Sequence, residues 1–88
     1  MQSYKFIISG RVQGVWYRRN VHVHASKSGF SGYVKNLSDG NVEAAVTCDE
    51  AKLADFIALL RRGSDLSRID SIEQIEITEH FNGDFEVR

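Results

Sequence analysis

The sequence predicts a single α+β domain in which two helices cover one face of a largely antiparallel sheet. Segments rich in β-forming residues alternate with two segments of helical periodicity, and clusters of turn residues separate them. The chain has 88 residues, of which 42% are hydrophobic, and this length suits one compact core. No internal repeat or linker is evident. We therefore expect residues 1–88 to form one domain.

The first element is a strand over residues 3–9. The β-strand period places Tyr4, Phe6 and Ile8 on one face of the strand, with Lys5 and Ile7 on the other. We expect this strand near the centre of the sheet.

A helix follows over residues 17–28. Tyr17, Val21 and Ala25 recur at four-residue spacing and form a narrow apolar stripe, and no glycine or proline interrupts the segment. Gly29 is suited to end the helix, because glycine readily adopts the left-handed conformation found after a helix C-terminus.

Residues 30–36 and 41–47 flank the turn sequence "LSDG", which predicts a β-hairpin with Asn36 at its entry. A second helix is predicted over residues 50–62, with Asp49 or Thr47 as its cap. Its apolar positions follow the helical template and are Leu53, Phe56, Ile57 and Leu60.

The last two elements are strands over residues 71–78 and 85–88, separated by the turn sequence "NGD". The resulting order is β-α-β-β-α-β plus a short C-terminal strand, which is the split βαβ or ferredoxin-like arrangement. In this arrangement the first and third strands are central neighbours. The topology hosts enzymes, RNA binders and ligand sensors, so it does not by itself determine function.

The charge balance limits the possible partners. Eleven Lys and Arg residues against twelve Asp and Glu residues give a net charge of −1, so no global positive field would hold nucleic acid or an anionic membrane. The single cysteine, Cys48, forms no internal disulfide, which favours a reducing compartment. The N-terminal apolar run is too short for a signal sequence or a membrane span. We expect a cytoplasmic monomer that binds neither nucleic acid nor membrane.

The segment "GRVQGVWYRRN", residues 10–20, combines two glycines with three arginines. It connects the first strand to the first helix and places Arg18 in the first helical turn. Unpaired amides at a helix N-terminus and in a glycine-bounded loop attract anions, and a guanidinium matches two phosphate oxygens. The segment therefore predicts a phosphate-sized cradle. The alternative is a tight turn beside a solvated arginine, although a first-turn cation is unfavourable against the helix dipole.

A second candidate segment is "GYVKNLSDG", which contains Asn36. A side-chain amide can accept a hydrogen bond from water while it donates one to a phosphoryl oxygen, so it can position a nucleophilic water without ionising. The alternative is that Asn36 is an ordinary turn residue. The sequence leaves open whether this hairpin lies beside the loop of residues 10–15.

Together, the two segments resemble the signature segments of the acylphosphatases, small enzymes that hydrolyse the carboxyl-phosphate bond. The resemblance spans nearly the whole chain and implies a small acyl phosphate substrate with no metal or cofactor. It implies that Arg18 holds the phosphate and that Asn36 orients the attacking water. It also implies substrate binding by amides of the loop, namely Gly10, Arg11, Val12, Gln13, Gly14 and Val15. The sequence departs from the family around the second helix, where "CD" and "GSDLS" replace turns that often contain glycine or proline.

The implied reaction agrees with the residues present. A carboxylate is a good leaving group, so positioning and charge stabilisation suffice without a strong general acid, and a phosphoryl oxygen of the substrate can take the proton. The competing class is a non-catalytic module, either an anion-binding relative or an RNA binder. An RNA binder requires aromatic residues on the first and third strands, and "NVEAAVT" contains none.

The remaining histidine, cysteine and aromatic side chains near these segments give weaker indications of function. His22 and His24 point to different sides of the predicted helix, which disfavours a shared metal site. Cys48 has no activating partner nearby in the sequence, so we expect a buried structural residue. Trp16 could stack on an aromatic acyl group, whereas Tyr17 heads the apolar stripe and is expected in the core.

Overall fold

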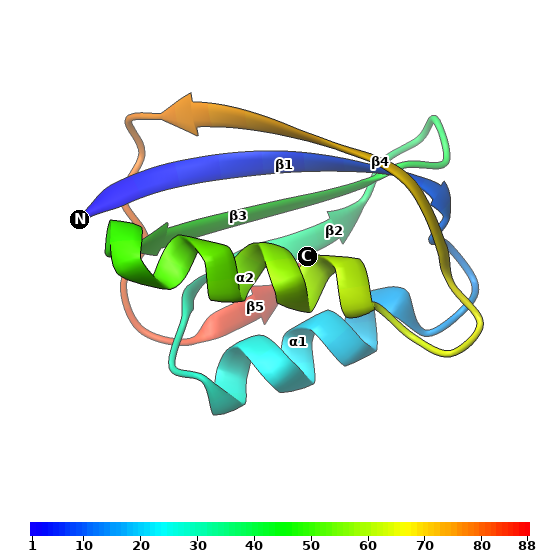
Figure 1. Cartoon of the computed structure of the whole chain (residues 1–88), viewed down its shortest axis with the longest axis horizontal. Coiled ribbons are helices and arrows are strands. Elements are labelled where there is room, and N and C mark those ends of the chain that lie inside the picture. The colour runs from blue at the N-terminus through cyan, green and yellow to red at the C-terminus, as the bar shows by residue number, and fades with distance from the viewer.

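The computed structural model describes residues 1–88, and its elements follow the predicted order. They are β1 (Gln2–Arg11), α1 (Tyr17–Lys27), β2 (Ser31–Asn36), β3 (Val42–Cys48), α2 (Glu50–Arg62), β4 (Arg68–Ile77) and β5 (Phe85–Val87). The five strands form one sheet in the order β4-β1-β3-β2-β5, and both helices cover the same face of it (Figure 1). Only the β2–β5 pair is parallel. The predicted α+β, ferredoxin-like arrangement is confirmed.

The boundary between β1 and the following loop differs from the prediction. β1 continues through Arg11, because Gly10 and Arg11 still pair with Ile69 and Arg68 of β4 after a bulge between Ser9 and Gly10. Gly10 permits the bulge, since its φ is +133° and a Cβ there would lie 2.1 Å from the Arg68 carbonyl oxygen. The loop before α1 therefore begins at residue 12 instead of residue 10.

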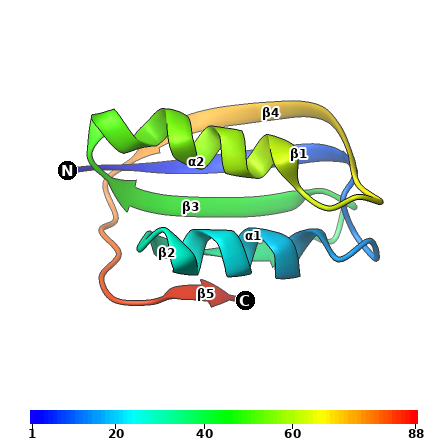
Figure 2. The same ribbon diagram turned by 60° about the horizontal axis from the view of Figure 1, so that its bottom comes forward.

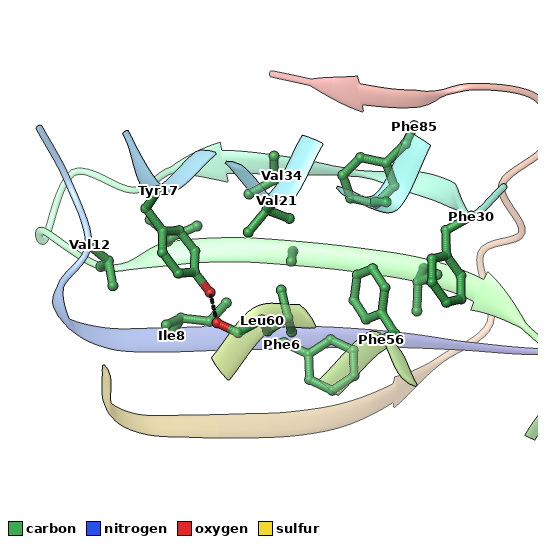
Figure 3. Packing of buried hydrophobic residues seen from close by; sticks show 14 of the residues in the cluster. Phe6, Ile8, Val12, Tyr17, Val21, Phe30, Val34, Phe56, Leu60 and Phe85 are labelled. Atoms are coloured by element: carbon green, nitrogen blue, oxygen red, sulfur yellow. Dashed lines mark hydrogen bonds between the residues drawn. The ribbon is translucent and has the colours of Figure 1, made fainter. Parts of the chain in front are cut away.

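The core lies between the sheet and the two helices (Figure 3). Tyr4, Phe6 and Ile8 all point into it, as their alternation predicts. Phe56 of α2 occupies its centre, and its ring centroid lies 5.6 Å from that of Phe6 and 5.1 Å from that of Phe30. Complete burial of one such side chain contributes about 1.5–3 kcal/mol, so this cluster is a major source of stability.

The helix α1 packs through the three residues of its predicted stripe. Tyr17, Val21 and Ala25 are all buried, with at most 1% of each exposed. The Tyr17 hydroxyl donates a hydrogen bond of 2.7 Å to the carbonyl oxygen of Leu60 in α2, drawn as a dashed line in Figure 3. This bond links the first turn of α1 to the last turns of α2. The N-terminus of α1 is thereby fixed against the core.

The predicted cap of α2 is only partly correct. Asp49 occupies the capping position, but its side chain accepts no capping hydrogen bond. Thr47 lies in β3 and does not cap the helix, because its hydroxyl instead contacts the Ser3 hydroxyl at 2.7 Å and accepts a bond from the Phe81 amide at 2.9 Å. The side chain of Thr47 is therefore occupied on the opposite face of the sheet.

Three connections meet at one end of the molecule. They are the β1–α1 loop, the β2–β3 hairpin and the α2–β4 loop, which lie together at the right of both Figure 1 and Figure 2. The topology thus brings the two signature segments to the same end of the sheet.

Neither helix is long and apolar enough to cross a membrane.

Candidate active site

Arg18 and Asn36 line the same pocket at this end of the molecule. Arg18 extends from the first turn of α1, and Asn36 is the last residue of β2. The pocket has a volume of about 490 Å³, and we call it the phosphate pocket. Its other lining residues are Val12, Gly14, Trp16, Tyr17, Arg19, His22 and Val87. The structure therefore brings together the two residues that sequence reasoning singled out from separate segments.

The backbone amides of residues 12–19 donate no hydrogen bond within the chain. The first helical bond of α1 runs from the Asn20 amide to the Trp16 carbonyl oxygen at 3.1 Å, and no side chain caps the helix. Trp16 has a φ of +65°, in the left-handed region. Free amides at a helix N-terminus carry a partial positive charge, which favours an anion at this position.

Only one hydrogen bond within the protein uses the N–H donors of the Arg18 guanidinium. Its Nη1 donates to the backbone oxygen of Arg88 at 3.2 Å, and no side-chain carboxylate pairs with it. The remaining N–H donors are free to form the two parallel bonds with which arginine holds phosphate oxygens. The side chain is thus placed beside the free amides with most of its donors available.

Gln13 connects the loop to the hairpin of Asn36. Its Nε2 donates to the carbonyl oxygens of Leu37 at 2.7 Å and Asn41 at 2.8 Å, which lie on the two sides of the turn. One side chain therefore fixes the distance between the loop that precedes Arg18 and the strand end that carries Asn36.

The Asn36 side chain is exposed and makes no hydrogen bond with the protein. The hydrogen bonds of the turn are made by other groups. Leu37 and Asn41 pair through their backbones at 2.9 Å, and the Asp39 carboxylate accepts the Asn41 amide at 3.0 Å. Asp39 thus performs the usual role of a turn residue, which leaves the Asn36 amide group available to a ligand or a water.

The remaining predicted site residues are distributed between the strand, the loop and a neighbouring pocket. Gly10 and Arg11 lie within β1 and do not line the phosphate pocket. Val12 and Gly14 line it, whereas Val15 lines the neighbouring pocket. Substrate binding by the six residues 10–15 stays a prediction.

The sequence analysis did not predict two of the residues that line the phosphate pocket. His22 and Val87 line the phosphate pocket. His22 lies one turn after Arg18, and this spacing is the only sequence signal for its position. Val87 comes from β5, and no sequence pattern connects that strand to the motif loop. Cys48 is buried at the opposite end of the molecule, where burial raises the pKa of its thiol.

The fold and the site together define a class of protein: a ferredoxin-like domain with a pocket lined by an arginine and a neutral amide side chain beside free backbone amides, a set of groups suited to a small anion. Comparison with known proteins narrows this class. The sequence profile of the acylphosphatase family matches residues 4–87. The acylphosphatase of Methanocella arvoryzae is 38% identical over 88 residues, which cover all of both chains. The acylphosphatase of Methylococcus capsulatus is 38% identical over 77 residues, or 88% of this chain and 84% of that protein.

A solved structure gives the same result. The crystal structure of acylphosphatase from Bacillus subtilis superposes with a TM-score of 0.92 at 34% identity, over 100% of this chain and 99% of that one. The chain belongs to the acylphosphatase family, and its function is that of an acylphosphatase, a hydrolase.

Proposed function

We propose that acyl phosphates are hydrolysed in the phosphate pocket, where Arg18 and the amides of the loop hold the phosphoryl group and Asn36 positions the attacking water. The observation that carries this proposal is that Arg18 and Asn36, from separate segments, line one pocket and have free hydrogen-bonding groups. The free amides of residues 12–19 support it, because this segment contributes most of the pocket lining and ends in a helix N-terminus with a partial positive charge.

The reaction proceeds by displacement at phosphorus. The oxygen of the water forms a bond to phosphorus as the bond from phosphorus to the acyl oxygen breaks, and the acyl group leaves as a carboxylate. The proton of the water passes to a phosphoryl oxygen of the substrate. Arg18 and the amides stabilise the negative charge on the equatorial oxygens, and such preorganised donors are each worth about a hundred- to a thousandfold in rate.

The charges of the pocket favour a mechanism without a metal ion. Arg18 and Arg19 both line it, and two guanidiniums oppose the binding of a metal cation as they attract a dianion. The proposed partner is accordingly a small acyl phosphate without metal or cofactor. We also propose that the protein acts as a monomer in the cytoplasm.

The RNA-binding alternative is not favoured by the placement of the aromatic residues. RNA binders of this topology stack bases on aromatic rings of the open sheet face. Tyr4 and Phe6 of β1 instead point toward the helices and are buried in the core. On the open face, Tyr33 is buried under Phe81, and its ring centroid lies 5.5 Å from that of Phe81.

Hydrolysis of benzoyl phosphate tests the proposal. The purified protein is incubated with benzoyl phosphate and an excess of chelator, and the loss of substrate absorbance is followed beside an Arg18→Ala variant. We expect turnover that the chelator does not affect and that the variant nearly abolishes. Turnover no faster than that of Arg18→Ala would leave only anion binding for this site. Loss of activity with the chelator would contradict metal independence.

A further inference from the structure

A second pocket adjoins the phosphate pocket on the side of the helices. It also measures about 490 Å³ and lies between α1, the end of α2 and the α2–β4 loop. We call it the acyl pocket and define it by Trp16, Arg19, His24, Arg62, Asp65 and Leu66. It shares only Trp16 and Arg19 with the phosphate pocket. These two side chains therefore form the boundary that a ligand spanning both pockets would cross.

The boundary is both apolar and cationic. Trp16 is 65% exposed, and the Arg19 guanidinium carbon lies over its ring at 5.9 Å from the centroid. Leu66, 61% exposed, contributes a second apolar side chain to the acyl pocket. Exposed large side chains of this kind offer a surface for the hydrocarbon part of a ligand.

The lining of the acyl pocket carries more positive than negative charge. Arg62 lines it, and neither Arg62 nor Arg19 takes part in an ion pair. Asp65 is the one carboxylate in the lining, so two guanidiniums face one negative charge. Free guanidiniums in one pocket attract a carboxylate or phosphate group and bind it with paired hydrogen bonds.

The leaving acyl group is expected to extend from the phosphate pocket toward the acyl pocket. In an in-line displacement the leaving group departs on the side of phosphorus opposite the attacking water. Asn36, which we propose to hold the water, belongs to the sheet and lines only the phosphate pocket. Trp16 and Arg19 belong to the helix side, so an acyl group that points away from Asn36 extends toward them.

We propose that the acyl pocket receives the acyl part of the substrate and selects acyl groups that carry a second anionic group at their far end. This inference rests on the proposed function of the phosphate pocket. Trp16 and Leu66 contact the hydrocarbon chain of the acyl group, and Arg19 and Arg62 bind its terminal carboxylate or phosphate. The preferred substrates are therefore acyl phosphates whose acyl group ends in a carboxylate or a phosphate. Acyl phosphates of simple monocarboxylic acids are expected to bind less tightly.

Two hydrolysis-resistant probes test the preference directly. Acetylphosphonate and succinylphosphonate share the acyl-phosphorus group and differ by one terminal CH₂–carboxylate. Trp16 is the only tryptophan of the chain and lines both pockets, so its fluorescence reports binding of either probe. We expect succinylphosphonate to bind about three- to tenfold more tightly at low salt, and the difference to shrink as salt screens the exposed charges.

Adjacent arginines supply a matched control. Arg61 and Arg62 are both exposed at the end of α2, but only Arg62 lines the acyl pocket. Arg62→Gln is expected to lower the affinity ratio of the two probes toward one, with Arg19 left to hold any remaining preference, whereas Arg61→Gln leaves the ratio unchanged. Equal affinities in the unmodified protein, or an equal loss of preference in both variants, would overturn the inference.

Hydrolysis of acetyl phosphate by the same preparation separates this inference from the proposed function. If acetyl phosphate is hydrolysed and the two probes bind equally, the phosphate pocket keeps its function and the acyl pocket loses its role. If acetyl phosphate is not hydrolysed, the proposed function fails. In that case, a preference for succinylphosphonate that Arg62→Gln abolishes would mean that the acyl pocket binds anions but does not serve hydrolysis. That result would also overturn the inference that the pocket receives the acyl group of a substrate.

Discussion

The side-chain amide of Gln13 donates a 2.7 Å hydrogen bond to the carbonyl oxygen of Leu37, the residue that follows Asn36. This bond joins the loop before Arg18 to the strand end that presents Asn36, and no other side chain makes such a connection. Catalysis by positioned groups is sensitive to displacements of about 1 Å. The distance between the two proposed catalytic side chains therefore depends on a residue whose side chain hydrogen-bonds to neither of them.

Replacement of Gln13 tests this dependence. Gln13→Ala removes both bonds to the hairpin, and Gln13→Asn is too short to make both. We expect kcat for benzoyl phosphate to fall at least about tenfold in each variant, because the loop and the hairpin lose their fixed separation. Gln74→Ala, at an exposed position of β4, is the control and should leave kcat unchanged. Wild-type kcat in Gln13→Ala, measured on folded protein, would show that the link is not needed.

The left-handed conformation of Trp16 leads to a stability prediction. Its φ of +65° is costly for any residue with a Cβ, and its side chain is largely exposed. Trp16→Gly should therefore be more stable than Trp16→Ala by about 1 kcal/mol, although glycine normally lowers stability. Urea unfolding of the two variants measures the difference. A Trp16→Ala protein that is at least as stable as Trp16→Gly would contradict a strained backbone at this position.

The bulge at Gly10 is expected to tolerate no side chain. Gly10 and Gly40 both have positive φ, but a Cβ at Gly40 meets no atom within 4 Å, whereas one at Gly10 meets the Arg68 carbonyl oxygen at 2.1 Å. Gly40→Ala should cost about 1 kcal/mol of the free energy of unfolding, and Gly10→Ala at least about 3 kcal/mol. Thermal and urea unfolding compare the two variants. Similar losses would mean that β1 and β4 separate easily at the bulge.

The sheet pairing at Gly10 also shows what the sequence could and could not predict. The periodicity of residues 17–28 correctly identified the helix and its buried stripe, because that stripe faces a single sheet. The end of β1 could not be read from the glycine. Gly10 is compatible with both a loop and a bulge, and the choice depends on β4, which is distant in the sequence.

The grouping of the proposed site residues in one pocket was predictable to a similar extent. The positive charge and helix position of Arg18 indicated an anion site from local chemistry alone. The proposed role of Asn36 depended on whether the β1–α1 loop and the β2–β3 hairpin meet at the same end of the sheet, which is a property of the topology. The contacts of Gln13 and the acyl pocket could not be predicted, because they join residues of separate loops.

Alkaline pH is expected to weaken the link between the helices. Burial raises the pKa of Tyr17 well above its usual value of about 10, and its hydroxyl donates to the Leu60 carbonyl oxygen. The contribution of the neutral phenol to stability is complete below pH 10, where the unfolded chain is also protonated. Above pH 10 the unfolded state loses this proton first, so the free energy of unfolding falls by up to about 1.4 kcal/mol per pH unit for this group.

Tyr17→Phe measures this contribution. The variant loses one hydrogen bond, worth about 1 kcal/mol at neutral pH. Between pH 10 and pH 12 its free energy of unfolding should fall less steeply than that of the unmodified protein, by the equivalent of one titrating group. Parallel pH profiles of the two proteins in urea unfolding would rule out a raised pKa of Tyr17.

The most direct test separates the roles of Arg18 and Asn36 by measuring inorganic phosphate affinity and benzoyl phosphate turnover on the same variants. Trp16 fluorescence reports the phosphate affinity, since its ring lines the phosphate pocket. Asn36→Ala should lower kcat by about a hundred- to a thousandfold and change the Kd for phosphate by less than about twofold. Arg18→Ala should raise that Kd at least about tenfold and nearly abolish turnover. Turnover close to wild type in either variant would contradict the assignment of these two residues.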